Sequence, residues 1–297
     1  MSKKVVKKER NLKGYIYSKI PFPEKIKKKI KDPYYDLVIW PIQRLKNKRN
    51  YGAWDIFGAV GIETTTHCNR RCPFCPNSKY DRGLKKNEKF MDEKLFKKII
   101  DELAEIKYRG IIRPFFYGDP LVDERMPKLV KYVKNKLPKA KIYLNTNGIA
   151  LTIPLYKKLY EAGIDYLMIS QYTADMLPNV KEFFEYMKTR PKKENKAKYR
   201  IFEIERLATS NRCGEVDVPV VAERPFCAYP GHYDLNINYK GDVLLCCNDY
   251  HGKIVFGNVK DEKIMDIWKK PHYQKIRKEV LKKIYKLSMC KKCVGIE

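Results

Sequence analysis

The chain has 297 residues, of which 44% are hydrophobic and 12% aromatic, so it can bury a full core and is too apolar to be disordered. No stretch approaches the ~20 consecutive apolar residues that span a bilayer, and the N-terminus lacks the apolar region of a secretory signal. We therefore expect a cytoplasmic protein whose nine cysteines serve metal binding or catalysis rather than disulfides.

Lysine and arginine outnumber aspartate and glutamate by 63 to 35, which leaves a formal net charge of +28. Such a charge attracts phosphorylated small molecules, nucleic acid or anionic membrane surfaces. The lysines are spread along the whole chain, however, which is also typical of solvated surface lysines. Composition therefore leaves three kinds of partner open: a small polar or anionic substrate, a nucleic acid and a membrane surface.

Three regions follow one another along the chain. Residues 1–56 form a basic N-terminal extension that prolines break into pieces, with a short helix predicted over residues 25–31. Residues 57–215 alternate between strand and helix patterns. Residues 216–297 hold five of the nine cysteines, a predicted hairpin with its turn at residues 240–241, and a helical pattern over residues 271–287.

The middle region repeats the strand–helix unit of a parallel sheet. We expect strands over residues 58–65, 111–117, 141–144, 166–170 and 199–204, and helices over residues 92–106, 126–137, 153–162 and 180–188. Right-handed crossovers between such strands predict an α/β fold, a partial (β/α)6 TIM-like barrel, followed by a small cysteine-rich C-terminal domain. Functional residues of these barrels lie at the carboxyl ends of the strands.

Three cysteines on one short loop follow the first predicted strand. Cys68, Cys72 and Cys75 have the spacing CxxxCxxC, and three thiolates on so tight a loop can reach three corners of an iron–sulfur cubane. A structural zinc site normally needs four ligands, and His67 beside Cys68 is poorly placed to bind the same ion. A zinc or redox use of the three thiols stays the alternative.

This loop resembles the cluster-binding loop of the radical S-adenosylmethionine (SAM) enzymes. The resemblance implies a [4Fe–4S] cluster whose open iron binds SAM, with Phe74 beside the adenine. It also implies that residues after the second, third and fourth strands contact SAM: Gly118, Asp119, Pro120, Asn145, Asn147, Ser170 and Gln171. The stretch YGDP at residues 117–120 departs from the family's GGEP pattern, with one glycine and an aspartate.

Four cysteines of the C-terminal region have the spacing C-x18-C-x43-C-x2-C: Cys227, Cys246, Cys290 and Cys293. The CxxC pair alone is compatible with zinc, redox or iron–sulfur chemistry. With Gly241 five residues before Cys246, the pattern resembles the SPASM and twitch branches of the same family. That resemblance implies a second, auxiliary [4Fe–4S] cluster in a SPASM/twitch-like domain, with zinc as the alternative.

Two cysteines, Cys213 and Cys247, fall outside both patterns. Either is a candidate hydrogen-atom donor to a substrate radical, and Cys247 could replace Cys246 as a cluster ligand. Free cysteines are more often small buried hydrophobic residues, and that interpretation stays open for both.

The resemblance implies reductive cleavage of SAM to a 5′-deoxyadenosyl radical, which abstracts hydrogen from an unactivated C–H bond of a polar substrate such as a sugar or cyclitol. Electron transfer to the auxiliary cluster would give oxidation, and hydrogen return from a thiol would give epimerisation. An external donor such as flavodoxin or ferredoxin would supply the electron. Two alternatives remain: radical modification of a peptide or RNA, and a non-catalytic basic iron–sulfur or zinc protein that binds RNA.

Overall fold

A computed structural model of the chain describes residue 37 and residues 40–51, 53–201, 211–217, 227, 234–281 and 283–296. The short helix predicted over residues 25–31 lies outside these. Contacts divide the chain into two compact units, Met1–Trp54 and Asp55–Glu297. In the first unit the structure contains the helix α3 (Trp40–Tyr51), which the sequence analysis did not predict, and Arg44 of this helix lies 5.8 Å from the ring centroid of Trp54.

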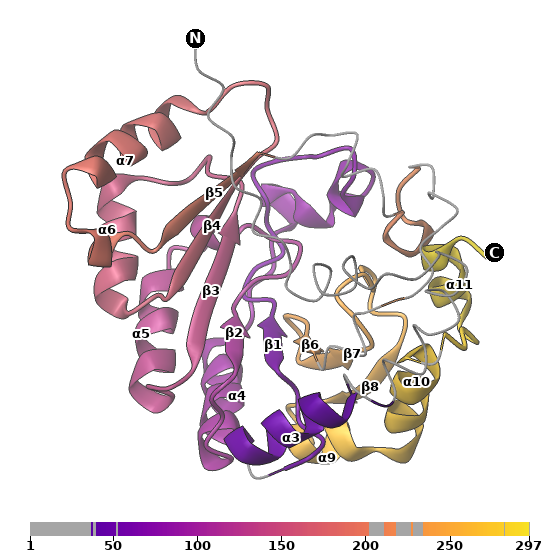
Figure 1. The fold of residues 1–297 in the computed structure, drawn as a ribbon. Helices are drawn as coiled ribbons and strands as arrows, with labels where there is room; N and C mark the ends of the chain where they lie inside the picture. Colours follow the sequence, from indigo (N-terminus) through magenta and orange to yellow (C-terminus); the bar gives the residue numbers. More distant parts are fainter. Residues whose placement is uncertain are drawn as a thin grey trace, which may run out of the picture. The chain divides into compact units, whose positions relative to one another are not determined.

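A sheet in the order β5-β4-β3-β2-β1-β6-β7-β8 runs through the described part of the second unit (Figure 1). Its first six strands along the chain all pair in parallel: β1 (Ala59–Ile62), β2 (Ile111–Arg113), β3 (Lys141–Thr146), β4 (Tyr166–Gln171), β5 (Ala197–Ile201) and β6 (Asp234–Ile237). The predicted partial barrel is confirmed. Residues 202–204, the end of the last predicted strand, lie outside the described residues.

The strand β6 joins the C-terminal region to the barrel. It lies beside β1, with Val60 opposite Leu235, and it also forms the predicted antiparallel hairpin with β7 (Asp242–Leu244). The sequence analysis missed β8 (Val255–Asn258), which extends this hairpin. One continuous sheet therefore carries the C-terminal cysteines next to the strand that leads into the first cysteine loop.

The helices α4 (Glu93–Glu105), α5 (Met126–Lys136), α6 (Ile153–Ala162) and α7 (Pro178–Lys188) alternate with β1 to β5, as predicted (Figure 1). The starts of α4 and α6 are capped by side chains. The Asp92 carboxylate accepts the N–H of Leu95 at 3.0 Å, and the Thr152 hydroxyl oxygen accepts the N–H of Leu155 at 3.2 Å. Gly163 ends α6 with a left-handed φ of 99°.

The described part of the C-terminal region also contains α9 (Ile264–Lys269), α10 (Pro271–Leu281) and α11 (Ser288–Val294). The single helix predicted over residues 271–287 is wrong at its end, because Lys283 has a left-handed φ of 63°, which a continuing helix does not allow. The sequence analysis also missed α9. Cys290 and Cys293 are three residues apart on α11 and therefore share a face.

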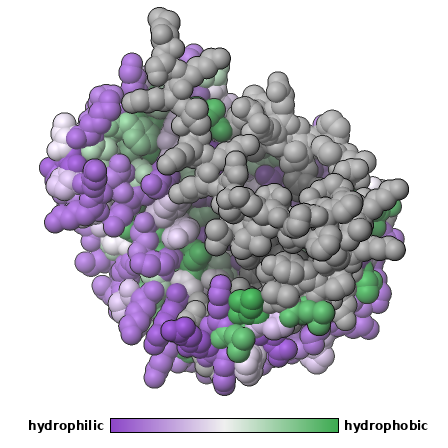
Figure 2. Space-filling view, in the orientation of Figure 1, coloured by the Kyte–Doolittle hydropathy of each residue, from purple (hydrophilic) through white to green (hydrophobic). Residues whose placement is uncertain are grey.

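Hydrophilic residues cover most of the described surface in Figure 2, and hydrophobic residues show there in separate groups. The core contains large aromatic side chains, among them Phe57, Tyr108 and Trp268, which are fully buried. The guanidinium of Arg277 lies 3.5 Å from the Trp268 ring centroid. No helix among the described residues is long and apolar enough to cross a membrane.

Candidate active site

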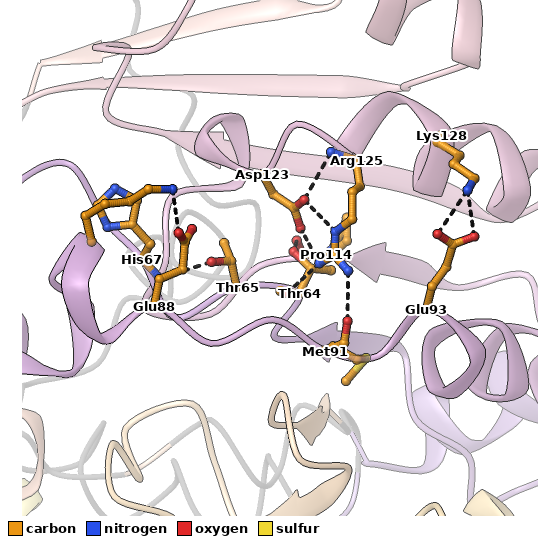
Figure 3. A network of polar contacts seen from close by, with 11 residues as sticks. Thr64, Thr65, His67, Glu88, Met91, Glu93, Pro114, Asp123, Arg125 and Lys128 are labelled. Atoms are coloured by element: carbon orange, nitrogen blue, oxygen red, sulfur yellow. Dashed lines mark hydrogen bonds and ion pairs between the residues drawn. The ribbon is translucent and has the colours of Figure 1, made fainter.

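A network around Arg125 holds the backbone between β1 and the first cysteine loop (Figure 3). The guanidinium donates to the carbonyl of Thr64 at 3.0 Å and to that of Met91 at 2.9 Å. The buried carboxylate of Asp123 fixes this guanidinium through two hydrogen bonds of 2.9 Å. These contacts fix the direction in which the chain leaves β1, so the first three cysteines lie at the carboxyl end of β1.

The first thiol group, defined as Cys68, Cys72 and Cys75, lies on a tightly turned loop. The N–H of Cys68 donates to the carbonyl of Gly83 at 3.0 Å, and the N–H of Cys75 donates to the carbonyl of Cys72 at 2.9 Å. All three thiols are free; Cys72 is buried and the other two are partly buried. His67 turns away, because its Nδ1 lies 3.0 Å from the Gly83 carbonyl oxygen.

Burial raises the pKa of each thiol of this group, and that of Cys68 to about 12. The Asp119 carboxylate contributes to the raised pKa of Cys68, whereas the guanidinium of Arg212 acts to lower that of Cys75. Metal ligation requires thiolates. A positively charged iron centre would supply the stabilisation that burial removes.

Phe74 packs against the segment that follows β4. Its ring centroid lies 5.1 Å from that of Tyr172. Arg70 holds the same tyrosine, donating to its carbonyl at 3.0 Å with the guanidinium 5.7 Å from its ring centroid. The structure thus brings the predicted adenine contact to the end of the fourth strand, where the predicted residues Ser170 and Gln171 lie.

A hollow opens at the carboxyl ends of β3 and β4. Asn147, Ser170 and Gln171 line it together with Tyr199, among other residues, and the Tyr199 hydroxyl donates to the Gln171 side-chain oxygen. Three of the predicted SAM contacts therefore come together in one place. Asn145 is exposed on β3 and is not among the residues that line this hollow.

Asp119 ties the loop after β2 to the end of β3. Its carboxylate accepts the N–H groups of Leu121 at 2.9 Å and Asn147 at 2.8 Å, and the hydroxyl of Thr146 at 2.9 Å. Pro120 follows as the first residue of the short turn Pro120–Val122. These three donors already satisfy the hydrogen bonding of the Asp119 carboxylate. A contact with SAM at this position would therefore come from the backbone.

Gly118 and Asn147 bring these loops up to the first thiol group. A Cβ on Gly118 would lie 2.2 Å from the carbonyl oxygen of Thr65, so only glycine permits this approach of the two backbones. The amide of Asn147 donates to the Asn69 side-chain oxygen at 2.9 Å and lies 3.7 Å from the sulfur of Cys68. The ends of the first three strands therefore meet at the cysteine loop.

The second thiol group consists of the six remaining cysteines, none of which forms a disulfide: Cys213, Cys227, Cys246, Cys247, Cys290 and Cys293. Burial, together with the nearby thiols of Cys246, Cys227 and Cys293, raises the pKa of Cys290 to about 12. Burial and the neighbouring Cys246 and Cys227 likewise raise the pKa of Cys247. The fold therefore gathers these thiols from several separate segments.

Polar contacts hold this second group in place. The amide of Asn248 lies 3.8 Å from the sulfur of Cys293 and accepts a hydrogen bond from Arg212 at 3.1 Å. The N–H of Cys227 donates to the hydroxyl of Tyr285 at 2.9 Å. Arg212, which also acts on the first thiol group, therefore lies between the two groups.

Two stretches of this chain match known families. Residues 62–200 match the radical SAM superfamily, and residues 227–294 match the SPASM iron–sulfur cluster-binding domain. The chain belongs to the radical SAM superfamily. Its cofactors are accordingly SAM and [4Fe–4S] clusters, one in the radical SAM region and an auxiliary one in the SPASM region.

Relatives of this radical SAM enzyme include the S-adenosyl-L-methionine-dependent 2-deoxy-scyllo-inosamine dehydrogenase of Niallia circulans, 29% identical over 245 residues, which cover 81% of this chain and 94% of that protein. PqqA peptide cyclase of Bradyrhizobium diazoefficiens is 34% identical over 116 residues, 38% of this chain and 28% of that one. The crystal structure of BtrN in complex with AdoMet and 2-DOIA matches 80% of this chain and 93% of its own at 28% identity, with a TM-score of 0.70.

The donor set of this radical SAM enzyme fits iron–sulfur clusters better than single ions. Among the described residues, no three or more His, Cys, Asp or Glu side chains converge as one metal ion would require. A cubane has irons at separate corners, so its thiolate ligands stand farther apart than those of one tetrahedral zinc. Soft thiolates are also the ligands that such clusters select.

Two buried polar groups were missed by the sequence analysis. Glu63, directly after β1, is fully buried; one carboxylate oxygen pairs with Arg82, and the other has no hydrogen-bond partner among the described residues. Burial raises the pKa of this carboxyl in spite of Arg82. The Tyr117 hydroxyl, after β2, is also buried without a partner there, and burial raises its pKa well above the usual value. An acid ending the apolar run GAVGIE was the available sequence signal for Glu63.

Tyr117 lies between the two thiol groups. Cys75 of the first group and Cys246 and Cys247 of the second all act electrostatically on its hydroxyl. Its ring also packs edge-on against that of Tyr250, with 4.7 Å between centroids. A substrate bound at this hydroxyl would therefore lie between the two cluster sites.

A second hollow lies beside the second thiol group, over α10 and the loop before α11. It is lined by apolar and basic side chains, one cysteine and Glu279, which pairs with Lys286; among the others are Lys275, Ile276, Val280, Ile284, Leu287 and Cys290. Lys278 borders an adjoining hollow that shares Lys275 and Ile284. A positively charged, partly apolar surface thus reaches a thiol of the auxiliary region.

Proposed function

We propose that this radical SAM enzyme is a dehydrogenase that oxidises a secondary hydroxyl group of a small polar substrate of the cyclitol or sugar class. The observation that carries the proposal is the Tyr117 hydroxyl, which is buried between the two thiol groups with no hydrogen-bond partner in the described part of the chain. Leaving such a group unsatisfied costs about 1–3 kcal/mol, and a substrate hydroxyl would complete its hydrogen bonding. The similarity to a 2-deoxy-scyllo-inosamine dehydrogenase over most of both chains supports the same substrate class.

In this proposal Cys68, Cys72 and Cys75 ligate the first cluster. The auxiliary cluster has the twitch arrangement with four thiolates, from Cys227, Cys246, Cys290 and Cys293. When bound, the first cluster and SAM supply hydrogen-atom abstraction, and the auxiliary cluster supplies an electron acceptor. SAM is bound by Phe74, the backbone of residues 118–120 and the hollow that Asn147, Ser170 and Gln171 line.

The chain's own residues handle the proton. An alcohol that becomes a ketone loses a hydrogen atom, an electron and the hydroxyl proton. Glu63 is the proposed proton acceptor, because its free oxygen is buried at the carboxyl end of β1 and its pKa is raised by burial. The ion pair with Arg82 fixes the other oxygen and so orients the carboxylate.

The electron carrier that reduces the enzyme is, in this proposal, an acidic protein such as flavodoxin or ferredoxin. It docks on the lysine-bordered hollow over α10, where Cys290 lies at the surface of the cavity. Opposite charges steer such encounters. Binding of nucleic acid or a membrane surface, the cytoplasmic location and the region boundaries at residues 56/57 and 215/216 stay predictions from the sequence.

The proposal is tested with enzyme reconstituted anaerobically and supplied with SAM, dithionite and a panel of cyclitols and amino sugars deuterated at their carbinol carbons. We expect one ketone and one deuterated 5′-deoxyadenosine per turnover. A substrate isomer that carries one solvent hydrogen would instead establish epimerisation, with Cys213 or Cys247 as donor. Turnover only with a peptide or an RNA would overturn the proposed substrate class.

A further inference from the structure

The turn that carries Cys213 has an unusual backbone. Three successive residues, Arg212, Cys213 and Gly214, have positive φ angles of 50°, 63° and 88°. The left-handed region is unfavourable for residues with a side chain, so two of these three residues are strained. Such strain persists only where surrounding contacts impose it, and it collects at functional sites.

Contacts on both sides of the turn impose this conformation. The Asn211 amide donates to the carbonyl of Lys292, inside α11, at 2.8 Å. Arg212 donates to the side chain of Asn248 at 3.1 Å. Beyond the turn, the carboxylate of Glu215 is held by three side chains from other segments. The turn is thus anchored on the same helix and loop that carry the predicted auxiliary-cluster ligands.

The strained turn places Cys213 in direct contact with two of those predicted ligands. Its side chain is buried, the turn Arg212–Gly214 packs directly on α11, and the nearby thiols of Cys246 and Cys293 both raise the pKa of the Cys213 thiol. Cys246 follows β7 and Cys293 lies on α11, so Cys213 adds a third segment to one small volume. A cubane with one iron on Cys246 and another on Cys293 would lie beside the Cys213 sulfur.

We propose that Cys213 is an iron ligand of the auxiliary cluster and competes with Cys227 for its fourth corner. The inference rests on the proposed assignment of the auxiliary cluster, in which Cys246, Cys290 and Cys293 supply three thiolates. A cubane that binds in this site must push the thiols of Cys213, Cys246 and Cys293 apart. The Cys213 thiolate then binds one of the cluster irons. Exchanging one thiolate for another leaves the charge of the ligand set unchanged.

This assignment also bears on the reaction. A cysteine whose sulfur binds iron carries no S–H bond, so it cannot return a hydrogen atom to a substrate radical. If Cys213 ligates iron, it cannot serve as the hydrogen-atom donor of an epimerase, and oxidation of the substrate is favoured.

The experiment isolates the auxiliary cluster in a background that lacks the first one, Cys68→Ala/Cys72→Ala/Cys75→Ala. In this background we compare C213A, C227A and the double variant C213A/C227A, with C247A as a matched control from the same thiol group. Each protein is reconstituted anaerobically, its iron and sulfide are counted, and its electron paramagnetic resonance (EPR) spectrum is recorded before and after mild oxidation.

We expect the parent, both single variants and C247A to hold about four irons per chain. The double variant has only three thiolates, so mild oxidation releases about one iron and produces the EPR signal of a three-iron cluster. If C227A alone behaves like the double variant, Cys213 supplies no ligand and the proposal is overturned.

Two further readouts keep the result decisive. Circular dichroism and thermal unfolding establish that each variant is folded, and the serine series C213S, C227S and C213S/C227S replaces any alanine variant that is not. Iron counting needs neither SAM cleavage nor a substrate. The iron count can therefore support ligation by Cys213 even if no substrate is dehydrogenated. Dehydrogenation can likewise be observed even if Cys213 proves not to be a ligand.

Discussion

The two thiol groups of this enzyme are built in opposite ways. The first takes three cysteines from residues 68–75 of a single loop, and the second takes six from segments spread between Cys213 and Cys293. The first has three thiols for three cluster corners and no spare. The second has more thiols than a cubane has irons to bind them. The comparison leads us to expect that the first site depends on each of its thiols, whereas the second tolerates the loss of one.

We expect the largest effect from removing one cysteine of the first thiol group, which has no spare ligand. We expect Cys72→Ala to lower 5′-deoxyadenosine formation by at least about 10³-fold, because two thiolates cannot hold the cluster that reduces SAM. Iron content should fall from about eight to about four per chain, since the auxiliary cluster remains. The matched change in the second group, Cys247→Ala, should keep all the iron. SAM cleavage at the normal rate in Cys72→Ala would contradict the comparison.

The next effect concerns the hydroxyl that lies between the groups. We expect Tyr117→Phe to lower kcat/KM for the oxidised substrate about 10–100-fold, the loss of one buried hydrogen bond of about 1.5–3 kcal/mol. Cleavage of SAM without substrate should be unchanged, because the first thiol group is intact. The control is Tyr143→Phe, a change on β3 at a partly buried residue outside both thiol groups. If SAM cleavage in the absence of substrate fell by the same factor as kcat/KM, Tyr117 would belong to the SAM site instead.

The same difference between the groups decides what could be predicted from the sequence. Spacing alone places three candidate ligands on one loop, so Cys68, Cys72 and Cys75 could be predicted as a group without the fold. Cys213 was not grouped with Cys246 and Cys293, because only the left-handed turn and its anchor on α11 bring them together. The pairing of β6 with β1 joins residues far apart in sequence, and no local pattern encodes it. Glu63 and Tyr117 depend on burial and on partners that tertiary structure alone defines.

A smaller effect tests whether an electron carrier docks on the surface next to the second thiol group. We expect K275E/K278E to slow reduction by flavodoxin about 3–10-fold at low salt, because two steering charges on the docking surface are reversed. Reduction by dithionite should be unchanged, which separates docking from cluster damage. The control K158E/K181E makes the same charge change on α6 and α7, whose neighbouring strands lie at the other end of the sheet. Equal slowing in both variants would show that only net charge matters.

The smallest effect lies in the sheet that supports the first group, at Asp165 between α6 and β4. Its carboxylate accepts hydrogen bonds from Lys134 at 2.6 Å, Lys141 at 2.9 Å and the N–H of Ile142 at 3.0 Å. Burial acts to raise the pKa of this carboxyl, but these three donors outweigh it and the pKa is lowered. Stability from the ionised form is therefore present above the unfolded-state pKa and is lost as the pH falls through the folded-state value.

We expect Asp165→Asn to lower the free energy of unfolding by about 1 kcal/mol at pH 7, since the lysines are partly solvated. The difference from the parent should shrink as the pH falls toward about 4, where carboxylates begin to protonate. Urea unfolding of both proteins at each pH measures it, with exposed Glu182→Gln as the control. A difference independent of pH would assign the effect to packing. The first thiol group should keep its iron throughout, because Asp165 supports β3 and β4 at their amino-terminal side, away from the ligands.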